Sequence, residues 1–153
     1  MQDLELKIPP DVVALVLAAL MWLASAVTPG LSFPLLVRVL VAGVPAVVGA
    51  GLIIDARVML GRARTTWQPG TPGRTAALVT GGVYRFSRNP MYLGMLLILV
   101  GWAAALMSPV ALGVSAVFVP YMDRFQIWPE ERVLSALLGQ SYRDYLSGVR
   151  RWL

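Results

Sequence analysis

The chain has 153 residues, of which 58% are hydrophobic and only 14% are charged. A soluble domain carries about a quarter charged residues, so this chain has too few polar side chains to cover the surface of a water-soluble globule. It contains no cysteine and no histidine, which excludes a disulfide framework, Cys/His zinc sites and histidine-based catalytic units, and no pattern indicates a metal. The formal net charge is +5, and in a membrane protein this basic excess marks cytoplasmic loops rather than a nucleic-acid interface.

Hydrophobic runs predict four transmembrane helices in a single all-α domain over residues 1–153. The expected spans are 12–28, 33–54, 91–107 and 110–123. The turn after the first span is short, so the second helix should pack antiparallel to the first. Within the second span, Pro45 should kink the helix. A face of small residues there suits close helix contact, at Gly43, Gly49, Ala50 and Gly51.

Residues 61–90 form a polar connection rich in arginine, glycine and proline, of a length typical of a functional loop. The last segment, 129–152, predicts one amphipathic helix with Pro129 in its first turn. Four crossings place both termini and the connection on one side, whereas the turns near Pro29 and Ser108 carry no charge. The positive-inside rule therefore predicts a multi-pass protein of the inner (cytoplasmic) membrane with both termini in the cytoplasm.

Two polar clusters lie at the predicted cytoplasmic mouth of this bundle. The first, Leu78 to Gly94, contains Leu-Val-Thr-Gly-Gly-Val-Tyr and Arg-Asn-Pro-Met-Tyr-Leu-Gly. It ends by opening a hydrophobic helix, whose N-terminal N–H groups suit an anion. The second is Glu-Glu-Arg-Val-Leu from Glu130, followed by Gly139 and Tyr142.

In this order and spacing, the clusters resemble the isoprenylcysteine carboxyl methyltransferase and phospholipid methyltransferase superfamily of integral membrane enzymes. The matching patterns are Leu-Val-Thr-x-Gly-x-Tyr, Arg-Asn-Pro-x-Tyr-x-Gly and Glu-Glu-x-x-Leu with Gly-x-x-Tyr beyond, and the closing segment 149–152 is also similar. The resemblance covers about residues 57–153. It implies S-adenosylmethionine-dependent methyl transfer to a lipid, lipid-linked or membrane-soluble acceptor at the cytoplasmic membrane face. The loop and the C-terminal helix would form the cofactor site.

Carried over by position, the resemblance implies that the cofactor lies between the two clusters. Carboxylates suit its amine or ribose, an asparagine amide suits a two-way hydrogen bond, and tyrosine and proline give flat apolar packing. The expected cofactor-binding residues are Leu78, Val79, Tyr84, Asn89, Pro90, Met91, Tyr92, Glu130 and Glu131. Arg85 or Arg88 would meet the methionyl carboxylate.

Arg88 and Glu131 are the predicted catalytic residues. Methyl transfer needs aligned reactants above all. A carboxylate or thiolate acceptor needs no base, whereas an amine or hydroxyl acceptor does, and the candidates are Glu131, Tyr92 and Asp123. The same residues also have structural interpretations: Asn89 and Pro90 as a helix start, the two glutamates as first-turn acids and the tyrosines as interfacial residues.

The chain departs from the pattern at the expected substrate site. In the prenylcysteine enzymes, an arginine four residues before the first glutamate contacts the substrate carboxylate. This chain has Gln126 there, with Arg124 nearby, and these two are the predicted substrate-binding residues. The departure weakens the case for a prenylcysteine substrate. Two other functions fit the same C-terminal region: an NADPH-dependent membrane sterol or lipid reductase, and a non-catalytic membrane scaffold.

Overall fold

The computed structural model describes residues 5–63 and 77–153, and these residues form helices and no β-strand, which confirms the all-α prediction for this part of the chain. The elements in chain order are α1 (Pro10–Val27), α2 (Leu35–Arg62), the 3-10 helix η2 (Gly82–Arg85), α3 (Pro90–Leu106), α4 (Pro109–Ala116), α5 (Phe118–Met122), the π-helical turn η3 (Asp123–Ile127), α6 (Trp128–Leu138) and α7 (Gln140–Gly148). Part of the expected connection over 61–90 lies outside the described residues.

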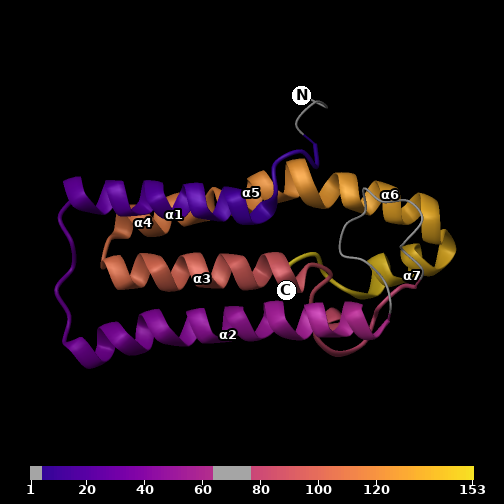
Figure 1. The fold of residues 1–153 in the computed structure, drawn as a ribbon, viewed down its shortest axis with the longest axis horizontal. Helices are drawn as coiled ribbons and strands as arrows, with labels where there is room; N and C mark the ends of the chain where they lie inside the picture. The colour runs from indigo at the N-terminus through magenta and orange to yellow at the C-terminus, as the bar shows by residue number, and fades with distance from the viewer. Residues whose placement is uncertain (1–4, 64–76) are drawn as a thin grey trace.

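Helix α3 lies between α2 on one side and the layer of α1 and α4 on the other (Figure 1). The second helix does run antiparallel to the first, but its packing partner is α3 rather than α1, because α3 separates them. The buried core lies where α1, α3, α4, α5 and η3 meet. It consists of Val13, Leu17, Met21, Leu99, Ala103, Ala111, Phe118, Met122 and Ile127.

The contact between α2 and α3 depends on glycine. A Cβ on Gly94 would lie 2.5 Å from the carbonyl oxygen of Gly49, and a Cβ on Gly101 would lie 2.6 Å from that of Ala42. Only glycine lets the two backbones approach this closely. The predicted small-residue face is therefore confirmed at Gly49. It is wrong at Gly43 and Gly51, where an added Cβ would meet nothing among the described residues within 4 Å.

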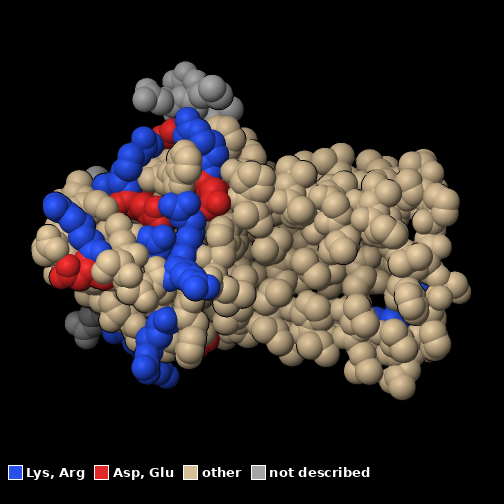
Figure 2. Space-filling model, turned by 180° about the vertical axis from the view of Figure 1, so that it is seen from behind, with Lys and Arg blue, Asp and Glu red and all other residues tan. Residues whose placement is uncertain are grey.

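Helices α1 and α2 are each long and apolar enough to cross a membrane. In the most apolar 18-residue stretch of each helix, only 11% of the residues in α1 and 6% of those in α2 are buried. These helices therefore expose their apolar side chains, whereas core helices of a soluble protein bury them. Figure 2 shows most of the charged side chains gathered at one end of the molecule, beside a long body that carries almost no charge except for a basic side chain near its far end. The shape and surface are those of a membrane protein.

Three boundaries differ from the sequence-based prediction. Helix α2 continues to Arg62, eight residues past the expected exit at residue 54, because charged residues end an apolar run without ending a helix. The span expected over 110–123 is broken between α4 and α5. The single C-terminal helix expected over 129–152 is two helices, because Gly139 takes a positive φ of +59°. From Val149 to the last residue the chain is not helical.

Candidate functional site

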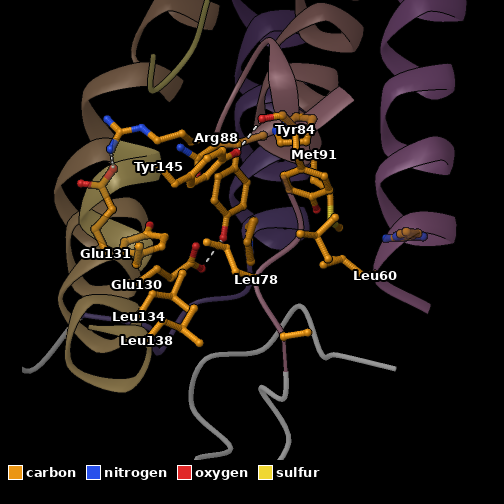
Figure 3. A pocket seen from close by; sticks show the side chains of 18 of the residues that line it. Leu60, Leu78, Tyr84, Arg88, Met91, Glu130, Glu131, Leu134, Leu138 and Tyr145 are labelled. Atoms are coloured by element: carbon orange, nitrogen blue, oxygen red, sulfur yellow. Dashed lines mark hydrogen bonds and ion pairs between the residues drawn. The ribbon is translucent and has the colours of Figure 1, made fainter. Parts of the chain in front are cut away.

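A cavity of about 310 Å³ lies at the charged end of the molecule. Its walls come from the starts of α1 and α3, the end of α2, residues 77–79, η2, α6 and α7. Figure 3 shows Glu130, Leu134 and Leu138 of α6 on one side of it and Leu60 of α2 on the other. The volume is that of a small-molecule site.

Both predicted clusters meet at this cavity. It is lined by all nine residues expected to bind the cofactor, together with Arg88: Leu78, Val79, Tyr84, Asn89, Pro90, Met91, Tyr92, Glu130 and Glu131. Side-chain contacts join the two clusters: the Tyr92 hydroxyl of α3 donates to Glu130 of α6, and Arg88 forms an ion pair with Glu131. Beyond α6 the chain turns at Gly139, and α7 returns toward the start of α3 (Figure 1). Their roles in binding remain predictions.

The two residues expected to bind substrate do not line the cavity. Arg124 forms an ion pair with Glu5 at 2.8 Å. Gln126 is buried, and its amide donates to the carbonyl of Ile8 at 2.6 Å. Both side chains therefore fasten the segment before α1 to η3.

Glu130 lies in the first turn of α6 and faces the cavity. The Tyr92 hydroxyl donates to its Oε1 at 2.5 Å. Burial raises the pKa of the Glu130 carboxyl to about 7; the Tyr92 hydrogen bond opposes this rise and the neighbouring Glu131 charge adds to it. Glu130 therefore changes its charge near neutral pH.

Tyrosines form much of the remaining wall. The Tyr145 hydroxyl on α7 donates to the carbonyl of Tyr84 at 2.7 Å, which ties α7 to η2. Burial raises the pKa of the Tyr145 hydroxyl to about 12, and burial also raises the pKa values of Tyr84 and Tyr142. These three side chains are therefore neutral at physiological pH and offer flat apolar faces.

Arg88 and Glu131 form an ion pair at 3.2 Å, and both side chains are largely buried. Glu131 also accepts hydrogen bonds from Arg151, at 2.7 Å to Oε2. The Nε of Arg88 is buried and has no hydrogen-bond partner among residues 5–63 and 77–153. A buried guanidinium nitrogen without a partner is costly, so this atom suits an acceptor on a bound molecule.

Asn89 precedes the first residue of α3, but its side chain makes no capping hydrogen bond to that helix. Its amide donates instead to the carbonyl of Arg151 at 3.1 Å. The helix-start interpretation thus holds for Pro90 at the beginning of α3 and not for the Asn89 side chain.

Comparison with known proteins identifies the family. The family model described as phospholipid methyltransferase matches residues 37–141. The chain belongs to the phospholipid methyltransferase family. An uncharacterized protein of Haemophilus influenzae is 45% identical over 64 residues, which are 41% of this chain and 100% of that protein. Protein-S-isoprenylcysteine O-methyltransferase A of Arabidopsis thaliana is 39% identical over 72 residues, which are 47% of this chain and only 36% of the plant protein.

Membership of the phospholipid methyltransferase family, together with the apolar helices, identifies a membrane methyltransferase in general terms and does not favour the reductase. The cavity lies mostly within the matched residues. Among the described residues, no group of three or more His, Cys, Asp or Glu could hold a metal ion.

Several cavity residues were not found by sequence reasoning. They are Pro10, Asp11, Arg57, Leu60, Ala77, Met95, Leu138 and Tyr145. Arg57 and Leu60 were missed because α2 was expected to end at residue 54. Leu138 and Tyr145 had a usable signal, since Leu138 is four residues after Leu134 and Tyr145 is three after Tyr142, spacings that share one helix face.

The raised pKa of Glu130 predicts that the unliganded protein loses stability as the pH rises. The folded state keeps the Glu130 proton up to about pH 7, whereas an unfolded chain releases it near 4.5, so the folded state binds more protons between these values. The stability due to this proton is present below pH 4.5 and is lost as the pH rises through about 7. Glutamine stays neutral at every pH, so Glu130→Gln should not show this loss of stability, which amounts to roughly 3 kcal/mol in the wild type.

Thermal unfolding of both proteins in detergent, at acidic and at alkaline pH, measures the difference. The gap between variant and wild type should open with rising pH. A gap that is constant with pH would show that Glu130 is not held in its protonated form.

Proposed function

We propose that this chain transfers a methyl group from S-adenosylmethionine to a lipid, lipid-linked or membrane-soluble acceptor, with the cofactor in the cavity between η2, α3 and α6. The observation that carries the proposal is the meeting of both family motifs at one cavity in a member of a methyltransferase family. The name of the plant relative, an isoprenylcysteine O-methyltransferase, supports the same chemistry.

The residues present fit this cofactor. It supplies an activated methyl group on a cationic sulfonium, and it also carries an ammonium, a carboxylate, a ribose and an adenine. Glu130 is an acid that can become a carboxylate near neutral pH and so balance the ammonium. Arg88 has a buried Nε suited to the carboxylate. Tyr84 and Pro90 offer flat apolar contact to the ring.

We assign different roles to the two predicted catalytic residues. Both carboxylate oxygens of Glu131 are engaged by the guanidinium groups of Arg88 and Arg151. Glu131 therefore orients Arg88, and Arg88 contacts the cofactor. Holding nucleophile, methyl group and sulfonium in line can supply up to roughly 7–11 kcal/mol of the catalysis.

A lipophilic acceptor is supported by the apolar part of the lining. Met95 lies one turn further along α3 than Met91, toward the apolar body, and Leu134 and Leu138 of α6 add apolar side chains on the opposite wall. The contacts of Arg124 and Gln126 with the N-terminal segment favour a structural role over substrate binding.

The same proposal includes the membrane arrangement. Helices α1, α2 and α3 would each cross the bilayer, and α4 and α5 together would form the fourth crossing. The charged end would then face the cytoplasm at the inner membrane, with both termini and the cavity there. The gathering of charge at one end of the molecule supports this orientation (Figure 2).

Calorimetric titration of the detergent-purified protein with S-adenosylhomocysteine tests the proposed function. We expect saturable binding of this product analogue and none of NADPH. Binding would justify a screen of membrane lipids for transfer of a radiolabelled methyl group. Binding of NADPH alone would favour the reductase, and binding of neither compound would favour the scaffold.

A further inference from the structure

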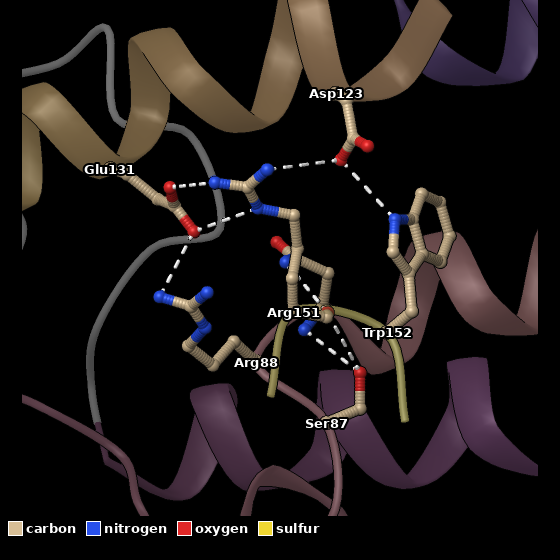
Figure 4. Close-up of polar contacts among 7 residues, drawn as sticks. Ser87, Arg88, Asp123, Glu131, Arg151 and Trp152 are labelled. Carbon is tan, nitrogen blue, oxygen red and sulfur yellow. Dashed lines mark hydrogen bonds and ion pairs between the residues drawn. The ribbon is translucent and has the colours of Figure 1, made fainter. Parts of the chain in front are cut away.

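Residues 149–152 do not line the cavity, but they contact residues that do or that precede α3. After α7 the chain continues from Val149 without regular secondary structure, and it passes beside the segment that leads into α3 (Figure 4). The backbone N–H of Arg88 donates to the carbonyl of Arg150 at 3.0 Å. The carbonyl of Arg151 accepts from the Asn89 amide at 3.1 Å and from the Ser87 hydroxyl at 3.3 Å. The C-terminal residues thus hold the backbone that carries Arg88 and Asn89.

The Arg151 side chain extends in the other direction, toward η3 and α6. It donates to both oxygens of Glu131, at 2.7 and 3.3 Å, and lies 3.7 Å from Asp123. Its guanidinium also lies 5.9 Å from the centre of the Trp128 ring. The Trp152 indole donates to the same Asp123 at 3.2 Å, which anchors the segment a second time.

The charges in this cluster balance. Two arginines, Arg88 and Arg151, face two acids, Asp123 and Glu131, in the order Asp123, Arg151, Glu131, Arg88. Without Arg151, Asp123 would keep the Trp152 indole as its partner and Glu131 would pair with Arg88 alone. Glu131 would then have both oxygens free to bind Arg88 as a planar fork, and this would draw the guanidinium away from the cavity.

We infer that Arg151 is a positioning residue for the methyl-transfer site: its side chain fixes Arg88 through Glu131, and it anchors the C-terminal segment whose backbone carbonyls hold Arg88 and Asn89. The inference rests on the proposed function where it concerns binding of the cofactor. Its structural part, control of residues 87–89 by the C-terminal segment, does not depend on that function.

Arg150 provides a matched control. It is the adjacent arginine and is exposed, and its side chain forms no ion pair among the described residues. Its carbonyl contact with Arg88 belongs to the backbone and survives substitution of the side chain. Arg150→Met and Arg151→Met therefore remove the same charge from neighbouring positions, but only Arg151→Met breaks the contacts to Glu131 and Asp123.

The test uses the full chain in detergent and two measurements. In Arg151→Met, hydrogen exchange of the Arg88 amide should be at least tenfold faster than in wild type, while α1 and α2 keep their protection. The Kd for S-adenosylhomocysteine should rise about tenfold. Arg151→Lys should recover part of both effects, and Arg150→Met should behave as wild type.

A double-mutant comparison separates positioning from general stability. If Arg151 acts through Glu131, Arg151→Met should raise the Kd much less in a Glu131→Gln background than in wild type. Exchange that quickens equally in every helix, additive effects on Kd, or equal losses in Arg150→Met would each overturn the inference. If even the wild type fails to bind S-adenosylhomocysteine while the Arg88 amide still responds to Arg151→Met alone, the proposed function fails and the positioning of residues 87–89 stands.

Discussion

Glu130→Gln is expected to weaken binding of S-adenosylhomocysteine at least tenfold while leaving the protein folded. Glutamine has nearly the same shape as glutamate, and its side-chain oxygen can still accept the hydrogen bond from Tyr92. Only the negative charge opposite the ligand's ammonium is lost. Hydrogen bonds to charged groups contribute about 1.5–3 kcal/mol, which corresponds to roughly ten- to 150-fold in affinity.

The pH dependence shows whether charge is the cause. Because burial raises the pKa of Glu130 to about 7, wild-type affinity should increase as the pH rises through that value and the carboxylate forms. The affinity of Glu130→Gln should not follow the same curve. Titration calorimetry at several pH values measures both. Wild-type affinity in the variant at alkaline pH would mean that the ammonium is not bound at Glu130.

Glu131→Gln makes a useful contrast, since the adjacent acid has a different environment. Its carboxylate pairs with Arg88 and Arg151, so its substitution should disturb the cluster as well as binding. The two adjacent glutamates look equivalent in the sequence. Only the structure shows that Glu130 faces Tyr92 and the cavity while Glu131 is held between two arginines.

The sequence predicts the helical class and the gathering of the two motifs well, for physical reasons. Long uncharged runs such as residues 12–27 have few alternatives to a helix in a membrane. The Arg-Asn-Pro motif leads into α3 at Pro90, the Glu-Glu motif lies in the first turn of α6, and both motifs line the cavity.

Other features could not be predicted because they depend on distant partners. Asn89 serves the C-terminal segment rather than its own helix, through a contact with Arg151 that lies 62 positions away in the sequence. The Gln126 amide donates a hydrogen bond to the carbonyl of Ile8, a residue that precedes α1. A hydropathy pattern cannot predict either contact, because each is a polar contact between segments that come together only in the folded protein.

Packing between helices is the other feature that hydropathy leaves open, and it leads to the second prediction. Gly49→Ala should destabilise the protein by about 1–3 kcal/mol, the usual result of forcing an extra methyl group into a tight contact. A Cβ at Gly49 would collide with the backbone carbonyl of Gly94, and it would come within 3.1 Å of Leu97 and Ile98 side-chain carbons. The carbonyl of Gly94 is part of a helix backbone, so it cannot rotate away from the added methyl group as a flexible side chain can.

Gly43→Ala supplies the control on the same helix. An added Cβ there meets nothing among the described residues within 4 Å, so the better helix propensity of alanine should make this variant as stable as wild type or up to about 1 kcal/mol more stable. Thermal unfolding in detergent compares the two variants, and equal unfolding temperatures would disprove the close contact. Arg57 and Leu60 of α2 also line the cavity. Because α2 packs against α3, disrupting this contact in Gly49→Ala should weaken binding of S-adenosylhomocysteine as well. The glycine contact within the bundle would then shape a site that lies at its charged end.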